Sequence, residues 1–209
     1  MNDRSYLQGL ISQGEHVQQD FKYRVQDAVK LARSVSAFAN TEGGRLLIGV
    51  RDDGHISGVR SEEEIFMMHQ AAWKYCQPAA SIKFDTYQVE GRTVVIATVP
   101  PSTRRPVFAI EDARRCAYIR IADENIVASP VHLAIWREEQ SSRGSVLTYG
   151  ETEKQLLAAL QGCEQLRLNA VVKRSRLPRP KVIALLARLV RYGVVACRFD
   201  GQEFLFSLV

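Results

Sequence analysis

Hydrophobic residues recur with a helical or strand-like period along the first two thirds of the chain. In residues 28–39 the apolar side chains fall three and four positions apart, so one face of a helix would be buried. Further helices are expected at 62–76 and 131–139. Short apolar runs bounded by turn residues predict strands at 46–50, 81–89, 93–99, 107–110 and 117–121. Helices and strands mixed in this order predict an α/β domain over residues 1–144.

The pattern changes after residues 141–145, a short polar stretch that suits a domain boundary. Beyond it, helices are expected at 151–160, 168–174 and 179–192, and strands at 194–199 and 204–208. Thr148 and Glu151 are spaced as a capping box, and Asp200-Gly201 predicts a hairpin turn. The order helix, helix, turn, helix, hairpin resembles the winged helix-turn-helix families. A small winged helix is therefore expected over residues 145–209.

The stretch 36–58 combines a helix end, a glycine turn, a buried strand and an acidic turn. Asn40 and Thr41 suit the helix end, and Gly43-Gly44 provides a backbone that can take positive φ. Two roles for these glycines stay open, a tight structural turn and a nest of amides for a phosphate. Because no Gly-Lys-Ser/Thr ending follows, nucleotide hydrolysis at a P-loop is not expected.

Three separated motifs carry a resemblance to a known family. Glu15 to Lys22 holds two acidic residues and a lysine, residues 36–58 hold the glycine turn and strand, and residues 105–107 with 116–128 form a closing hairpin. In this order they resemble the Alba-type domain of Schlafen-family proteins over about residues 8–140. The resemblance implies an Alba-like α/β fold and a nucleic-acid partner.

In Schlafen proteins that cut RNA, the resemblance implies a carboxylate cluster that holds a divalent metal. By position its members would be Glu15, Asp20 and Asp52, with Lys22 close to a phosphate oxygen. Such oxygen ligands suit Mg²⁺ or Mn²⁺. A spacing of five places Glu15 and Asp20 on opposite faces of a regular strand, so a bend or loop at Glu15 is required. The family usually has Glu where this chain has Asp20.

Positive charge is concentrated near the end of the chain. The net charge is +5, and nine basic residues with no acidic one lie between Leu166 and Arg198. The helix expected at 179–192 would bury Ile183, Leu186 and Val190. Its opposite, outward stripe carries Lys181, Ala184, Arg188 and Arg191. Cations ahead of this helix that would contact the DNA backbone are Lys173, Arg174, Arg176 and Arg179. This pattern predicts a nucleic-acid-binding second domain.

Composition favours a protein that stays inside the cell. The N-terminal residues are too polar for a signal peptide, and the longest apolar runs are too short to cross a bilayer. The four cysteines are scattered without metal-ligand spacing, so reduced thiols are favoured over a zinc site. The aromatic residues Phe38, Trp73, Tyr75 and Trp136 are expected in the core. We therefore expect a cytoplasmic protein of bacterial type.

DNA binding, in the service of transcriptional regulation, is the leading functional hypothesis. DNA is favoured over RNA as the partner, no cofactor is required, and a homodimer would match paired half-sites. The first alternative is a Mg²⁺- or Mn²⁺-dependent endoribonuclease of Schlafen type, which would use Glu15, Asp20, Lys22 and Asp52. The second alternative is a protein-interaction adaptor that docks its partner through the winged helix.

Overall fold

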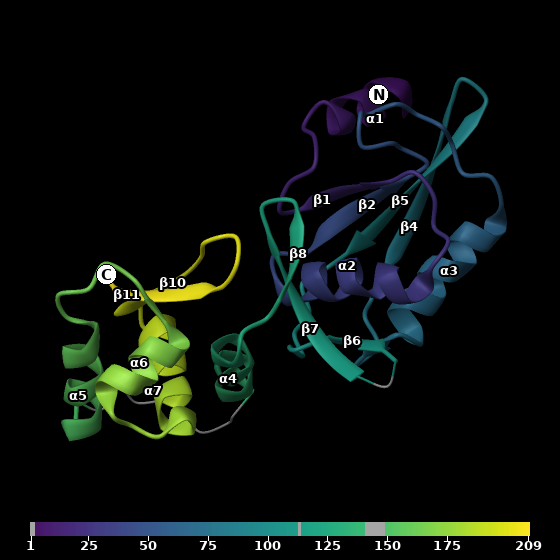
Figure 1. The fold of residues 1–209 in the computed structure, drawn as a ribbon. Coiled ribbons are helices and arrows are strands. Elements are labelled where there is room, and N and C mark those ends of the chain that lie inside the picture. The colour runs from purple at the N-terminus through teal and green to yellow at the C-terminus, as the bar shows by residue number, and fades with distance from the viewer. Residues whose placement is uncertain (1–2, 113, 141–148) are drawn as a thin grey trace. The chain divides into compact units, whose positions relative to one another are not determined.

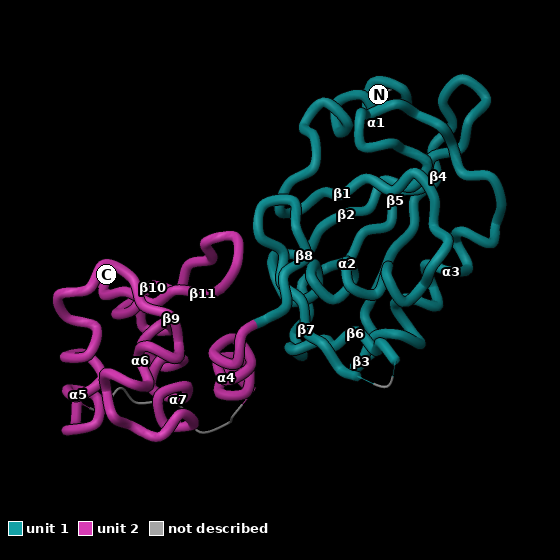
Figure 2. The backbone as a smooth tube through the Cα atoms, in the orientation of Figure 1, with its two compact units in different colours: residues 1–128 teal, residues 129–209 magenta. Residues whose placement is uncertain are grey.

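A computed structural model of the chain describes residues 3–112, 114–140 and 149–209. The chain divides into two compact units, residues 1–128 (unit 1) and residues 129–209 (unit 2), which Figure 2 shows in different colours. The boundary expected at 141–145 and the capping residue Thr148 lie outside the described residues. No helix in the described part of the chain is long and apolar enough to cross a membrane.

The first sheet of unit 1 has four strands in the order β1-β2-β5-β4. Their bounds are β1 Gln19–Lys22, β2 Gly44–Ile48, β5 Arg92–Val99 and β4 Lys83–Val89. β1 runs parallel to β2, and the other pairs are antiparallel. Leu46 and Ile48 of β2 pack with helix α2 (Ala28–Asn40), while Leu47 packs with helix α1 (Asp3–Ile11). Alternate residues thus fill two cores, one on each face of the sheet.

Helix α2 lies between this sheet and a second one, as Figure 1 shows. The second sheet has the order β3-β6-β7-β8, with bounds β3 Cys76–Gln77, β6 Phe108–Glu111, β7 Arg114–Ile121 and β8 Glu124–Val127. Helix α3 (Glu62–Trp73) packs beside α2. Because α2 touches structure on several sides, its buried positions extend well beyond one apolar stripe.

Two polar residues of α2 hold the second sheet in place. The Asn40 side-chain amide donates to the carbonyl oxygens of Val107 (2.8 Å) and Tyr118 (2.9 Å), and its oxygen accepts from the Val107 amide (2.7 Å). The Ser36 hydroxyl donates to the Val107 carbonyl and accepts from the Tyr118 amide. These buried groups are therefore paired, as low-dielectric surroundings require. Asn40 ends its helix as expected and, in addition, connects α2 to β7.

The Gly43-Gly44 turn packs too closely for any side chain. Gly43 has φ +75°, and its amide donates to the Phe38 carbonyl (3.0 Å). A Cβ on Gly44 would lie 2.3 Å from the Phe38 ring. Since the Gly43 amide is already used inside the fold, the turn has a structural role and not the role of a phosphate nest.

The described residues of unit 2 form four helices and a small sheet. Its elements are α4 Pro130–Glu139, α5 Glu151–Leu160, β9 Leu166–Arg167, α6 Leu168–Ser175, α7 Arg179–Arg191, β10 Val195–Phe199 and β11 Phe204–Leu208. The antiparallel sheet has the order β10-β11-β9. The core gathers Leu156 of α5, Val171 of α6, Leu186 of α7 and Phe206 of β11. Each expected helix and strand of residues 149–209 is present within about two residues of its predicted ends.

Three expectations differ from the structure. Helix α4, expected to close the first domain, packs against α7 and belongs to unit 2. Of the expected core face of α7, Leu186 is buried, but Ile183 and Val190 are only partly buried against the core. The other buried positions of this helix are Val182, Leu185, Ala187 and Leu189. This face is wider because α4 covers an additional side of the helix. Trp73 is 76% exposed at the end of α3, whereas a core position was expected.

Candidate nucleic-acid interface

Five exposed cations lie on the consecutive elements α6, its following turn and the start of α7. This basic surface consists of Lys173, Arg174, Arg176, Arg179 and Lys181. Arg176 adopts φ +53° in the turn, which directs the chain from α6 into α7. Arg174 donates through Nε to the Ala159 carbonyl (2.9 Å), and Arg179 donates to the Asn169 side chain. Within the described residues, none of the five forms an ion pair with a carboxylate, although Lys181 lies near enough to Glu153 to help lower the pKa of that carboxyl group. All five side chains are exposed.

The C-terminal half of α7 is covered by α4. The Arg188 guanidinium lies 3.7 Å from the Glu138 carboxylate of α4, and its side chain is 29% exposed. The neighbouring Ala187 is fully buried. The outward position expected for Arg188 is therefore wrong, because the sequence pattern did not place α4 against this side of α7. Lys181 and Arg191, at the two ends of the helix, are exposed as expected.

In unit 1 the structure brings together Glu15 and Asp20, two of the three predicted metal ligands. Glu15 precedes β1, and its carboxylate accepts from the Phe21 amide (2.7 Å), so the chain bends at Glu15 as the spacing required. Asp20, 3% exposed, forms ion pairs with Lys22 (2.8 Å) and Arg120 (3.5 Å). The two carboxyl groups lie close enough for each to shift the pKa of the other.

The Glu15 and Asp20 carboxyl groups shift each other's pKa in opposite directions. Burial and the hydrogen bond to Asp20 raise the pKa of Glu15 to about 7. Burial would also raise the pKa of Asp20, but the hydrogen bond from Glu15 and the charges of Lys22 and Arg120 outweigh it and lower that pKa. Below about pH 7, Glu15 is thus mostly protonated while Asp20 stays charged.

Asp52 does not join this pair. It is exposed in the turn after β2, and no contact among the described residues connects it to Glu15 or Asp20. No group of three His, Cys, Asp or Glu side chains in the described residues could hold a metal ion. The Asp20 carboxylate already faces two side-chain cations, Lys22 and Arg120. These residues therefore do not fit a divalent cation, and we derive no reaction step through one.

Arg120 is the functional residue of this cluster that sequence reasoning missed. It is 3% exposed, and its guanidinium donates to the Gln19 carbonyl (3.2 Å) and the Asn125 side chain (3.0 Å). It thereby connects β7 of the second sheet to β1 of the first. Its position inside the closing-hairpin motif was the only signal in the sequence, and that motif does not reveal which acid it meets.

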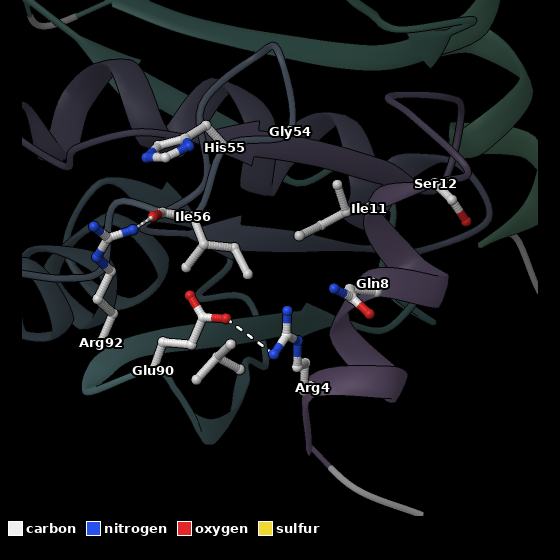
Figure 3. A pocket seen from close by; sticks show the side chains of 10 residues that line it. Arg4, Gln8, Ile11, Ser12, Gly54, His55, Ile56, Glu90 and Arg92 are labelled. Atoms are coloured by element: carbon white, nitrogen blue, oxygen red, sulfur yellow. Dashed lines mark hydrogen bonds and ion pairs between the residues drawn. The ribbon is translucent and has the colours of Figure 1, made fainter.

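A pocket of about 360 Å³ lies between α1, residues 54–56 and the turn between β4 and β5. Figure 3 shows that Arg4 pairs with Glu90 (3.1 Å) and that Arg92 donates to the Ile56 carbonyl (2.6 Å). The charged groups lining this pocket are thus engaged by unit 1 itself, which makes it a weaker candidate than the basic surface.

Comparison with solved structures gives distant similarities. The DIP2311 protein from Corynebacterium diphtheriae is 19% identical to this chain, with a TM-score of 0.48. The match covers 90% of this chain but only 34% of that protein, about a third of its length. The N-terminal domain of a RecG-related protein from Nitrosomonas europaea, described as an ATP-dependent DNA helicase relative, is 21% identical with a TM-score of 0.43, over 72% of this chain and 97% of that domain. No curated protein matches the chain.

The family comparison is more specific and covers the motifs around the two sheets. The model described as Schlafen, AlbA_2 matches residues 15–129, from Glu15 through the closing hairpin of β7 and β8. More than half of the chain lies within this match. The chain therefore belongs to the Schlafen AlbA_2 family.

Proposed function

We propose that the protein binds duplex DNA through unit 2, which acts as a winged helix, and that it regulates transcription. The observation that carries this proposal is the basic surface, because its five exposed cations form no ion pair with any described carboxylate and are available to phosphate groups. In a helix-turn-helix module the second helix enters the major groove with its N-terminal residues foremost. Here that helix is α7, and its exposed N-terminal cations are Arg179 and Lys181.

The remaining cations suit the DNA backbone beside the groove. Lys173 and Arg174 end α6, and Arg176 occupies the turn, so the three flank the start of α7. With five phosphate contacts, affinity would fall by a factor of about 500 between 50 and 200 mM salt. The hairpin of β10 and β11 contributes less, because Asp200 and Glu203 lie at its tip and Glu203 pairs with Arg167 (2.9 Å).

A homodimer is part of the proposal. One copy of unit 2 offers a single α7 and therefore a single half-site contact. A two-fold dimer would present two such helices to a palindromic operator. DNA is favoured over RNA because the major groove of duplex DNA admits a helix and that of RNA does not.

The test removes charge from the basic surface without changing side-chain length greatly. The triple variant Lys173→Gln, Arg176→Gln and Lys181→Gln should bind a duplex on the order of 100-fold more weakly at 0.1 M salt, measured by fluorescence anisotropy. The matched control, Lys74→Gln, Lys83→Gln and Lys154→Gln, removes three exposed charges elsewhere and should retain wild-type affinity. Equal losses in both variants would show that only total charge matters and would overturn the proposal.

A further inference from the structure

Helix α3 of unit 1 carries two aromatic side chains that the fold leaves exposed. Phe66 is 62% exposed and Trp73 is 76% exposed. They lie seven positions apart, close to two helical turns, so both fall on the same side of the helix. The opposite side buries Met68, Ala71 and Ala72 in the core around α2. Single exposed apolar residues are ordinary, but two large rings on one side of a helix form a patch typical of a protein contact.

The space between the two rings is occupied by side chains of the same helix. His69 and Gln70 lie one turn from each ring, on the same side of α3. The His69 ring stacks on Phe84 of strand β4, with 4.5 Å between the ring centres. The α3 face thus consists of Phe66, His69, Gln70 and Trp73. In Figure 1, α3 lies beside α2 at the outside of unit 1, so a second helix has access to this face.

The two ends of the α3 face carry opposite charges. Glu62 and Glu63 are exposed in the first turn of the helix, and Lys74 is exposed directly after its last residue. Among the described residues none of the three forms an ion pair, and the Lys74 ammonium lies over the Tyr75 ring, 5.3 Å from its centre. A second helix of the same sequence matches these charges only if it runs in the opposite direction.

An antiparallel second copy of α3 brings together both the rings and the charges. With a two-fold axis midway between Phe66 and Trp73, each Phe66 lies opposite the partner's Trp73. In the same register Glu63 lies opposite position 76 of the partner, which is about 3 Å along the helix from Lys74. Glu63 and Lys74 are eleven positions apart, close to three turns, so they share one flank of the α3 face. The two-fold operation places each flank beside the same flank of the other copy, and the Glu63–Lys74 contact therefore forms twice.

We propose that the α3 face joins two copies of this chain as a two-fold dimer, through antiparallel pairing of α3. The homodimer is part of the proposed function, and the inference rests on it in that respect and adds the surface. Phe66 and Trp73 fill the centre of the contact, where most of the binding energy of an interface arises. The Glu63–Lys74 contacts at the rim fix the direction of the partner helix, and this self-complementarity selects a second copy over an unrelated protein.

The experiment follows Trp73 in the full chain without nucleic acid. The chain has two tryptophans, and Trp136 is only 5% exposed, so iodide quenches mainly the fluorescence of Trp73. Analytical ultracentrifugation between about 1 μM and 1 mM protein gives the fraction of dimer. Quenching by iodide should fall in step with that fraction. A chain that stays monomeric over this range, or a dimer whose Trp73 is quenched as strongly as in the monomer, would overturn the proposal.

Removing the two rings tests the centre of the contact. Phe66→Ser with Trp73→Ser should weaken dimerisation by a factor of about 100. Tyr149→Ser, the matched control, removes an aromatic side chain of unit 2 that is 69% exposed and should leave dimerisation unchanged. Urea unfolding shows whether each variant is folded. Wild-type dimerisation of the Phe66 and Trp73 variant would refute the inference, and if this variant does not fold, the charge reversals below decide.

Reversing charge tests the antiparallel direction. Glu63→Lys places like charges together at both ends of the contact and should weaken dimerisation about tenfold at low salt, and adding Lys74→Glu should restore it to within about threefold of wild type. Neutralisation alone, as in Lys74→Gln, should have little effect, because an exposed ion pair contributes little. Glu124→Lys reverses an exposed charge elsewhere on unit 1 and should change nothing. Failure of the double reversal to restore the dimer would contradict the proposed pairing.

This inference and DNA binding by unit 2 can fail separately. The triple variant of the basic surface should dimerise like wild type, because its substitutions lie on unit 2. Loss of duplex binding by that variant, in a chain whose Trp73 stays open to iodide, would refute the α3 dimer and leave DNA binding standing. Protection of Trp73 in the dimer, with wild-type duplex binding by the triple variant, would support the α3 dimer and refute DNA binding through the basic surface.

Discussion

The cluster around Asp20 in unit 1 and the basic surface of unit 2 both contain several charged residues, but the charges are buried and paired in the first and exposed in the second. In unit 1, Asp20 and Arg120 are each 3% exposed and face each other, with Glu15 and Lys22 completing the balance. In unit 2, Lys173, Arg176 and Lys181 are exposed and, among the described residues, form no ion pair with a carboxylate. Charges that are buried and paired hold elements together, whereas exposed charges without a partner remain available to a polyanion.

The largest expected effect comes from removing one member of the buried cluster. Arg120→Met leaves the Asp20 carboxylate buried with only Lys22 opposite, and it breaks the bonds between β7 and β1, so we expect a loss of about 3–5 kcal/mol in the free energy of unfolding. Urea unfolding measures this loss. Arg104→Met, at an exposed position of the same unit, should cost less than about 0.5 kcal/mol. A loss below about 1 kcal/mol for Arg120→Met would contradict the assigned role.

A smaller effect concerns the ionisation of Glu15 beside Asp20. Because the pKa of Glu15 is raised from 4.5 to about 7, the folded state holds this proton more tightly than the unfolded state, and stability falls as pH rises from about 4.5 through 7. Glu15→Gln cannot ionise and keeps a donor to Asp20. The variant should match wild type at pH 5 and be about 1–2 kcal/mol more stable at pH 8, after allowance for partial exposure. Parallel pH profiles for the two proteins would refute the raised pKa of Glu15.

The smallest effect is expected where α4 covers α7. Replacing both Arg188 and Glu138 by Leu exchanges a partly buried, 3.7 Å ion pair for apolar contact, which should change the free energy of unfolding by no more than about 1 kcal/mol. Duplex affinity should stay within about twofold of wild type, because Arg188 is not on the basic surface. A tenfold loss of affinity at unchanged stability would show instead that Arg188 takes part in DNA binding.

Local patterns in the sequence predicted the elements better than their partners. The helix ends at Asn40 and Arg191 and the hairpin around Asp200-Gly201 follow from periodicity and turn residues close by in the chain. The pairing of Asp20 with Arg120 joins residues a hundred positions apart, and no local pattern specifies it. For the same reason, no local pattern predicted that α4 packs on α7 or that Glu138 pairs with Arg188. The exposed cations Lys173 to Lys181 were predictable because a continuous run without acids needs no distant information.

The salt dependence of duplex binding tests the contrast between paired and unpaired charges most directly. For wild type, log affinity plotted against log salt concentration should have a slope of about −4.5, one phosphate contact for each cation of the basic surface. The triple variant Lys173→Gln, Arg176→Gln and Lys181→Gln should reduce this to about −1.8 while the free energy of unfolding changes by less than about 1 kcal/mol. An equal slope for the two proteins would contradict the account.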